Sequence, residues 1–393
     1  MTTVLVAGAL ANKPRNGGGT WERMSWVVGL RQLGFDVCFV EQISPQACID
    51  VTGDVTTFAN SVNLAWFRSV TQWFGVADRA ALVYAGGVEC AGMPWTRLLE
   101  IAESADLLVN LSGHLTLAPL LERIRRKAYI DVDPGFTQFW HADPRTHFHV
   151  GGHDFYFTIG ENIGSPDCTI PTGGIPWRPI RQPVVLKDWP VATTGNRDRF
   201  TTIASWRGPF GPVQFDGRTY GLKAHEFRKF LALPRQLGSS NARRSAFEVA
   251  LDIHHGDSKD LAALRENGWR VADPRAVAGD PATFRQYVQE SGAEFSVAQG
   301  IYIETNSGWF SDRTVRYLAS GKPTLIQDTG FGRNYPVGQG LLAFRTQEDA
   351  AAGAAEIAHD YNCHCRAARA LAEKYFDSDL VLGQLMDEVG IRL

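Results

Sequence analysis

The loop at residues 304–312 and the helix expected after it carry the clearest chemical signal in the chain. Ser311 and Asp312 are favoured capping residues, and they place the start of this helix directly after a loop that contains glycine and serine. A helix start presents free backbone N–H groups and the positive end of the helix dipole. Arg313, in the first turn, adds a planar set of donors that suits phosphate oxygens. This combination predicts a diphosphate-binding site.

The elements that would position this helix are a strand before it, then a tight turn and a second strand. We expect the first strand over the apolar segment Phe295–Ile303. Gly321 is a natural C-cap, and Pro323 prevents the helix from continuing. The apolar spacing predicts that Arg313 and Arg316 lie on the helix surface, away from its buried stripe. An ordinary crossover helix with a solvated arginine would show the same local pattern.

Residues 311–344, SDRTVRYLASGKPTLIQDTGFGRNYPVGQGLLAF, resemble the C-terminal half of GT-B glycosyltransferases, and they are most similar to the group-1 branch. The resemblance rests on a Ser-x-Arg helix start, the turn LASGKP and a later glycine-rich loop. In that family the helix start holds the diphosphate of a nucleotide sugar. The N-terminal half of the chain resembles the family only in layout.

The chain departs from the family pattern at one point. Many retaining members carry two glutamates eight positions apart in this region, and the second contacts the ribose. The corresponding positions here are Gly308 and Arg316, so the pair is missing. Its absence slightly favours an inverting reaction.

The resemblance also implies how the leaving diphosphate is stabilised. GT-B enzymes use a helix dipole and cationic side chains rather than a metal ion. Lys223 follows the first strand of the C-terminal half, although it could equally be a solvated lysine at a helix start, and Arg207 is a weaker candidate. The residues assigned to the donor diphosphate site are Arg313, Lys223, Ser307, Gly308, Ser311 and Asp312.

Glycosyl transfer also needs a general base for the acceptor hydroxyl, and three residues are candidates. His114 and Asp133 each follow an expected strand, which would place them at the mouth of a cleft, and His141 lies further along. Alternation puts Asp131 and Asp133 on the same side of an extended segment. An aspartate before proline is also a good turn former, so a structural role is equally possible. We prefer Asp133 to His114.

Three glycines, Gly17, Gly18 and Gly19, end the loop that follows the first expected strand, Thr3–Leu10. Thr20 would then cap the next helix. The Gly-x-Gly-x-x-Gly dinucleotide fingerprint is absent. In GT-B enzymes glycines at this place let the backbone approach the donor phosphates or the acceptor, whereas a flexible surface loop would have the same composition.

Strands alternate with helices in two series, which predicts an α/β fold of two doubly wound Rossmann-like domains, and the resemblance implies that they face each other across a cleft. A proline-rich segment separates the two series. We expect an acceptor-side domain at residues 1–180, a linker at 181–196 and a nucleotide-sugar-binding domain at 197–375. By resemblance, residues 376–393 would form a helix that crosses back to the first domain.

Composition narrows the class of protein. The net charge of −3 argues against a nucleic-acid partner, whose binding rests on a basic surface. The six cysteines are scattered, and neither a signal peptide nor a membrane-spanning apolar run is present, so we expect a cytoplasmic protein.

The histidine-rich stretch His141–His153 could bind zinc through His147 and His149, but it fits no zinc signature, and we expect no metal site.

The sequence thus predicts a metal-independent glycosyltransferase that uses a nucleoside diphosphate sugar as co-substrate and needs no other cofactor. The acceptor would be a hydroxyl-bearing small molecule or glycan. Two alternatives remain open: a nucleotide-sugar 2-epimerase of the same fold, and a catalytically silent sugar-nucleotide-binding protein. The nucleotide base, the sugar, the stereochemical course and the oligomeric state are not predicted.

Overall fold

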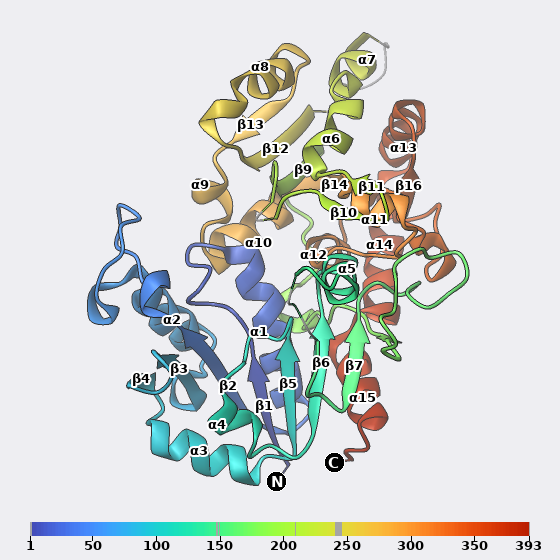
Figure 1. The fold of residues 1–393 in the computed structure, drawn as a ribbon. Helices are drawn as coiled ribbons and strands as arrows, with labels where there is room; N and C mark the ends of the chain where they lie inside the picture. The colour runs from blue at the N-terminus through green and yellow to red at the C-terminus, as the bar shows by residue number, and fades with distance from the viewer. Residues whose placement is uncertain (1, 147, 149, 209, 240–245, 393) are drawn as a thin grey trace.

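The computed structural model describes residues 2–146, 148, 150–208, 210–239 and 246–392, and it contains two β-sheets that are each flanked by helices (Figure 1). The first sheet has the strand order β4-β3-β2-β1-β5-β6-β7-β8. Its neighbouring strands are parallel, except that β3 and β4 are antiparallel. Its strands are β1 (Thr3–Ala7), β2 (Asp36–Ile43), β3 (Ala80–Tyr84), β4 (Glu89–Gly92), β5 (Leu107–Leu111), β6 (Lys127–Asp131), β7 (Phe155–Thr158) and β8 (Arg178–Pro179).

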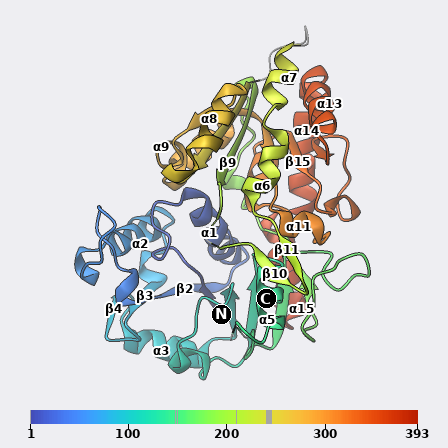
Figure 2. The ribbon, with the colours of Figure 1, turned by 45° about the horizontal axis from the view of Figure 1, so that its top comes forward.

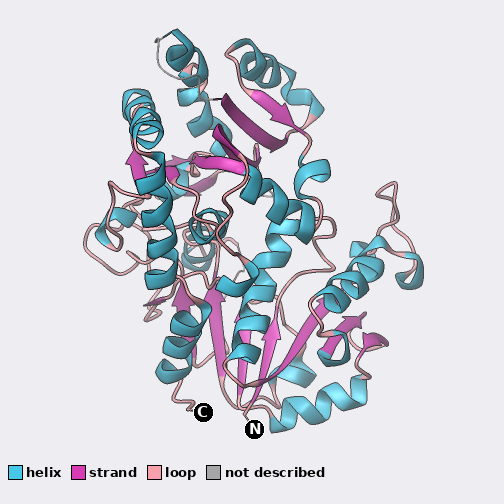
Figure 3. Ribbon diagram, turned by 180° about the vertical axis from the view of Figure 1, so that it is seen from behind, coloured by secondary structure: helices cyan, strands magenta, loops and turns pink. Residues whose placement is uncertain are grey.

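Helices cover both faces of the first sheet, because its central strands are apolar on both sides. One face packs against α1 (Gly17–Gln32), α2 (Val62–Trp73) and α15 (Ser378–Glu388). The other face packs against α3 (Trp95–Ser104) and α4 (Ala118–Leu121). The helix α5 (Phe136–Ala142) follows β6. Seen from behind, the last helix, α15, ends at the C-terminus beside the first sheet (Figure 3), where it packs against α1.

The second sheet is wholly parallel, with the order β13-β12-β9-β14-β15-β16. Phenylalanines from its central strands stack in the core under the flanking helices. Its strands are β9 (Asn196–Ser205), β12 (Ala246–Asp252), β13 (Arg270–Ala272), β14 (Ser291–Ser296), β15 (Thr324–Gln327) and β16 (Leu341–Phe344). A separate hairpin is formed by β10 (Val213–Phe215) and β11 (Arg218–Tyr220).

Helices of the C-terminal part pack on both faces of this second sheet, apart from a short one at Gly300–Glu304 that packs between the two domains. They are α6 (Lys223–Phe227), α7 (Leu233–Ser239), α8 (Ser258–Glu266), α9 (Pro274–Ala278), α10 (Pro281–Glu290), α11 (Gly300–Glu304), α12 (Asp312–Ala319), α13 (Gln347–His359) and α14 (Tyr361–Tyr375). Both units are therefore doubly wound. Over the described ranges, no helix combines the length and the hydrophobicity that crossing a bilayer requires.

The local signals around α12 are confirmed, but the strand before it is shorter than predicted. Ser311 caps the helix, and Gly321 follows it with a φ of +69°, which favours glycine. The strand β14 ends at Ser296, and the second half of the predicted strand is the helix α11. Ile301 and Tyr302 on this helix are buried between the two domains. A short apolar run does not distinguish a strand from a buried helix by periodicity.

The three glycines are not a loop: they form the first turn of α1, and Asn16, not Thr20, is its N-cap. Asn16 Oδ1 accepts a hydrogen bond from Gly19 N at 2.8 Å. A Cβ on Gly17 would overlap the carbonyl oxygen of Asp280, and one on Gly18 would lie 2.8 Å from the Phe284 ring. The glycines therefore let the start of α1 pack against α10 of the other domain.

A second contact between the domains centres on the buried side chain of Asn162 (Figure 2 shows the C-terminal domain above the N-terminal one). Its Nδ2 donates to the carbonyl oxygens of Asn306 at 3.0 Å and Gly330 at 3.1 Å. Its Oδ1 accepts from Asn334 Nδ2 at 3.0 Å. One amide therefore joins the first domain to two loops of the second.

The substitution Asn162→Ala should destabilise the protein by about 1–3 kcal/mol, because it leaves buried carbonyl and amide groups without partners. Urea unfolding of this variant and of Asn60→Ala, at an exposed position, measures the difference. Equal stability of the two variants would show that the Asn162 contacts contribute nothing to the joining of the domains.

Candidate active site

A cleft of about 520 Å³ lies between the carboxyl ends of the two sheets. In the first sheet the chain order reverses between β1 and β5, and in the second it reverses between β9 and β14. Residues that follow β1 and β6 line the cleft on one side, and residues that end or follow β9, β12 and β14 line the other. Ligands of open α/β sheets bind at such reversal points, so this cleft is the candidate site.

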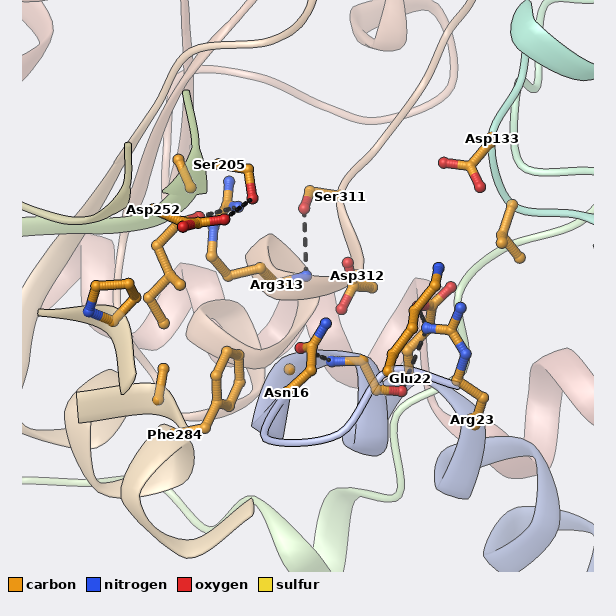
Figure 4. Close-up of a pocket in the computed structure, with 18 of the residues that line it drawn as sticks. Asn16, Glu22, Arg23, Asp133, Ser205, Asp252, Phe284, Ser311, Asp312 and Arg313 are labelled. Atoms are coloured by element: carbon orange, nitrogen blue, oxygen red, sulfur yellow. Dashed lines mark hydrogen bonds and ion pairs between the residues drawn. The ribbon is translucent and has the colours of Figure 1, made fainter. Parts of the chain in front are cut away.

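The cleft has two distinct ends with the start of α12 between them (Figure 4). Ser205, Asp252 and Phe284 lie at the end that belongs to the C-terminal domain. The lining contains more cations than carboxylates, which favours an anionic ligand. The cations are Lys13, Arg15, Arg23, Lys223, Arg275 and Arg313, and the carboxylates are Glu22, Asp133, Asp252 and Asp312.

Arg313 lines the cleft, but the prediction that it lies on the helix surface is wrong. Its Nε donates to Glu294 Oε1 at 2.6 Å, and its terminal nitrogens donate to Ile203 O at 2.8 Å and Ser296 Oγ at 2.6 Å. Glu294 is fully buried, and a buried carboxylate needs a paired cation. Three of the five guanidinium N–H groups are thereby used, which leaves one on each terminal nitrogen.

Arg316 is also buried rather than on the surface. It donates to the carbonyl oxygen of Asp312 and, at 3.2 Å, to Ser25 Oγ on α1. The position at which the resemblance expects a ribose-binding glutamate is thus occupied by a cation that joins α12 to the other domain.

Lys223 begins α6 and lines the cleft. Its Nζ donates to the carbonyl oxygen of Val297 at 3.0 Å. Burial and the neighbouring charge of Arg313 lower the pKa of Lys223 to about 7. The ammonium therefore stands in a crowded cationic environment that a bound anion would relieve.

Of the four remaining residues assigned to the diphosphate site, two line the cleft and two do not. Ser311 and Asp312 line the cleft. Ser307 does not: it is buried, and its Oγ donates to the carbonyl oxygen of Tyr302 at 3.0 Å. Gly308, with a φ of +71°, packs closely against Asn162 instead of lining the cleft. Ser307 and Gly308 shape the loop because they pack against the other domain. A contact between domains leaves no pattern in the local sequence.

Asp133 lines the cleft, whereas Asp131 is buried behind it, so the two do not share an accessible side. Asp131 accepts hydrogen bonds from Thr137 Oγ1 at 2.8 Å, Gln138 Nε2 at 2.7 Å and Thr158 Oγ1 at 2.7 Å. Burial raises the pKa of Asp131 to about 6, against the effect of these donors. Its role is to hold the turn that carries Asp133, whose backbone N–H also donates to it.

His114 lines a second, smaller pocket of about 360 Å³ rather than the main cleft. Burial and the charges of Arg23 and Lys13 lower the pKa of His114 to about 3. His141 does not line the cleft either, and its Nδ1 accepts from Val150 N at 3.3 Å. Of the three candidate bases, only Asp133 faces the cleft.

The described part of the histidine-rich stretch forms no metal site. His153 contacts Gly151 O and Asn110. Within the residues that the structure describes, no group of three or more His, Cys, Asp or Glu side chains could hold a metal ion. His147 and His149 lie outside the described residues. Arg207 pairs with Asp257 and does not line the cleft.

Sequence reasoning missed the charged residues of the segment that follows β1. Lys13 and Arg15 precede α1, and Glu22 and Arg23 pair with each other on its second turn. The segment is held by Glu41, whose buried carboxylate accepts from the backbone N–H groups of residues 10, 11 and 12 at 2.9, 2.7 and 2.8 Å. The signal that could have found these residues is their place just after the first strand.

No protein-family model matches this sequence, and no curated protein sequence matches it. Solved structures do. An alpha-glucosyltransferase in complex with UDP and a DNA 13-mer is similar over 98% of this chain and 99% of its own, with a TM-score of 0.58 and 10% identity. HepE of Anabaena, in complex with UDP-glucose, is similar over 99% of this chain and 99% of its own, with a TM-score of 0.56 and 11% identity. Sucrose-phosphate synthase of Thermosynechococcus elongatus is similar over 99% of this chain and 99% of its own, with a TM-score of 0.51 and 10% identity.

These structures are GT-B glycosyltransferases, and the likeness shows the fold. The chain has the GT-B architecture of two doubly wound α/β domains that face each other across a cleft, as the sequence predicted.

Because Arg313 pairs with the fully buried Glu294, Arg313→Ala should lower the free energy of unfolding by about 3–5 kcal/mol, since it leaves a buried carboxylate unpaired. The loss should grow as pH rises above about 4.3, the unfolded value, because the folded state would keep Glu294 protonated while the unfolded state releases the proton.

A double-mutant cycle with Glu294→Ala provides the control. The double variant should lose clearly less stability than the sum of the two single variants. Additive losses would mean that the pair does not stabilise the fold, and that Arg313 is held by other contacts.

Proposed function

We propose that the protein is a glycosyltransferase that moves a sugar from a nucleoside diphosphate sugar to a hydroxyl-bearing acceptor. The observation that carries the proposal is the juxtaposition of the start of α12 with Arg313 and Lys223 in the cleft between the two sheets. The GT-B fold and neighbours that bind UDP or UDP-glucose support it.

In this proposal the diphosphate lies against the N-terminus of α12. The backbone N–H groups of the first turn, the free N–H groups of Arg313 and the ammonium of Lys223 stabilise the charge that develops on the leaving group. The nucleoside extends toward the end of the cleft where Asp252 and Phe284 lie.

The acceptor approaches from the N-terminal domain, and Asp133 is the proposed general base. It takes the proton of the acceptor hydroxyl as the acceptor oxygen bonds to the anomeric carbon. The bond from that carbon to the β-phosphate oxygen breaks, and the nucleoside diphosphate leaves.

The two alternatives are less well supported by the site. A 2-epimerase would need a histidine and a carboxylate around the sugar, and no histidine is among the described residues that line the cleft. A silent binding protein would have the same nucleotide site but no turnover, so only an activity measurement separates it from a transferase.

A thermal-shift panel of nucleoside diphosphates, followed by assays of nucleotide release from the matching sugar donors, tests the proposal. We expect release from at least one donor. Asp133→Asn should lower kcat by about 10²–10⁴-fold with unchanged nucleotide affinity, because it removes a base but no donor contact. Asp387→Asn, at an exposed position outside the cleft, is the matched control. Binding without turnover would support the silent protein, and equal kcat values would exclude Asp133 as the base.

Leaving-group stabilisation by α12, Arg313 and Lys223 requires no divalent ion, so turnover should survive exhaustive chelation. The measurement is the rate of nucleotide release before and after treatment with a chelator. A loss of activity that magnesium or manganese restores would contradict the assignment of the diphosphate site.

The pKa of Lys223 at about 7 predicts a pH dependence of nucleotide binding. The charged ammonium is present below this value and is lost above it, so affinity for the diphosphate should fall by about tenfold between pH 7 and 9. Lys223→Arg keeps its charge and should flatten the profile. A flat profile in the parent protein would show that Lys223 does not contact the diphosphate.

A further inference from the structure

The nucleoside end of the cleft lacks the glutamate that the resemblance places beside the ribose. Arg316 occupies that position, and it is buried and joins α12 to α1. The described lining of the cleft includes four carboxylates. Glu22 and Asp312 each form an ion pair with an arginine, and Asp133 follows β6 of the other domain. The fourth is Asp252, which lies at the nucleoside end (Figure 4).

The place of Asp252 in the sheet is one that doubly wound folds use for an acidic residue. Counted along the chain, the order β13-β12-β9-β14-β15-β16 is the Rossmann order 3-2-1-4-5-6, with β9 as the first strand and β12 as the second. Asp252 is the last residue of β12. In dinucleotide-binding sheets of this order, an acidic residue beyond the first strand and helix hydrogen-bonds the ribose 2′-hydroxyl.

The strand register places Asp252 next to the proposed diphosphate position, but not in it. Arg313 Nη1 donates to the carbonyl oxygen of Ile203 on β9 at 2.8 Å. Asp252 is opposite Ser205, two residues further along β9 and one strand across. Strand geometry makes this a step of about 7 Å along the strands and about 5 Å across them. The group that follows the phosphates in a nucleotide, the ribose, would lie over this step.

The chemistry of Asp252 fits hydroxyl groups rather than phosphate. Its side chain is exposed, and a carboxylate accepts hydrogen bonds but donates none. Ser205 Oγ donates to its Oδ2 at 3.4 Å, and no cation among the described residues pairs with it. Its backbone is fixed, because Trp206 N donates to Asp252 O at 2.8 Å. A carboxylate repels phosphate, whereas its two oxygens can accept from two neighbouring hydroxyls.

An apolar surface for the base lies at the same end of the cleft. Pro274 and Ala278 belong to α9, which packs against β12, and Phe284 belongs to α10, which packs against α9. All three residues line the cleft. The C-terminal domain thus offers cations for the phosphates, a carboxylate beside them, and apolar side chains at the same end.

We propose that Asp252 binds the 2′- and 3′-hydroxyls of the donor ribose and makes the protein selective for ribonucleotides over deoxyribonucleotides. This inference rests on the proposed function and assigns the residue that takes the place of the missing glutamate. The carboxylate comes from the end of the second strand instead of from α12, where Arg316 is committed to the contact with the other domain.

The experiment compares two ligands in three proteins by calorimetric titration. The ligands are the nucleoside diphosphate that stabilises the protein most and its 2′,3′-dideoxy form. The proteins are the parent, Asp252→Ala and, as a matched control at an exposed position outside the cleft, Asp387→Ala. Thermal unfolding of each protein without ligand shows whether the substitution alters the fold.

We expect the parent and Asp387→Ala to bind the ribonucleotide more tightly than the dideoxy form by about tenfold or more, since hydrogen bonds to a charged group are lost. Asp252→Ala should bind both ligands alike, at the parent's affinity for the dideoxy form. A parent that does not distinguish the two ligands overturns the inference, whatever the variant does. Equal loss of both ligands in Asp252→Ala would place the carboxylate at the base, and unchanged binding would leave it without a ligand contact; either result overturns the inference while the proposed function stands. If no nucleoside diphosphate binds the parent, the proposed function itself fails.

Discussion

The buried carboxylate of Glu294 is the constraint on which the site depends. It lies in the central strand region of the second sheet with no exposure to solvent, so the fold must supply a cation within the protein. Arg313 supplies it from the first turn of α12 and also binds the carbonyl oxygen of Ile203 on β9. The start of α12 is thereby fixed against two strands, and Ser311, Asp312 and Arg313 line the cleft. The side chain of Arg313 thus neutralises a carboxylate of the core and also forms part of the cleft wall.

The same helix is fixed to the other domain. Arg316 reaches Ser25 on α1, and the glycines at the start of α1 allow that helix to approach α10. Asn162 joins the domains on a further side, through the loops at 306 and 330. The two walls of the cleft are therefore related by specific contacts and not only by the connecting chain. This explains how residues of the first domain, Asp133 among them, come to line the same cleft as Arg313.

Features that depend on neighbours in the sequence could be predicted, and features that depend on distant partners could not. Ser311 and Gly321 bound α12 because capping is local, and the alternation of strands and helices revealed the doubly wound fold. The ion pair of Arg313 depends on Glu294 of β14, and the role of Gly17 depends on the carbonyl oxygen of Asp280, the N-cap residue of α10. His114 and Asp133 both follow strands, but His114 lies in a pocket that loops of the first domain form among themselves, and Asp133 lines the cleft. Lys13 was overlooked because a cation in a loop has no periodic signature.

A crystal structure of the protein with the nucleoside diphosphate that stabilises it most tests the central claim directly. We expect the two phosphates to lie against the first turn of α12, with phosphate oxygens within hydrogen-bond distance of Lys223 Nζ and of a terminal nitrogen of Arg313. The Arg313–Glu294 pair should persist in the complex. A nucleotide that binds in the pocket beside His114, or anywhere that leaves Lys223 and Arg313 without contact to phosphate, would contradict it.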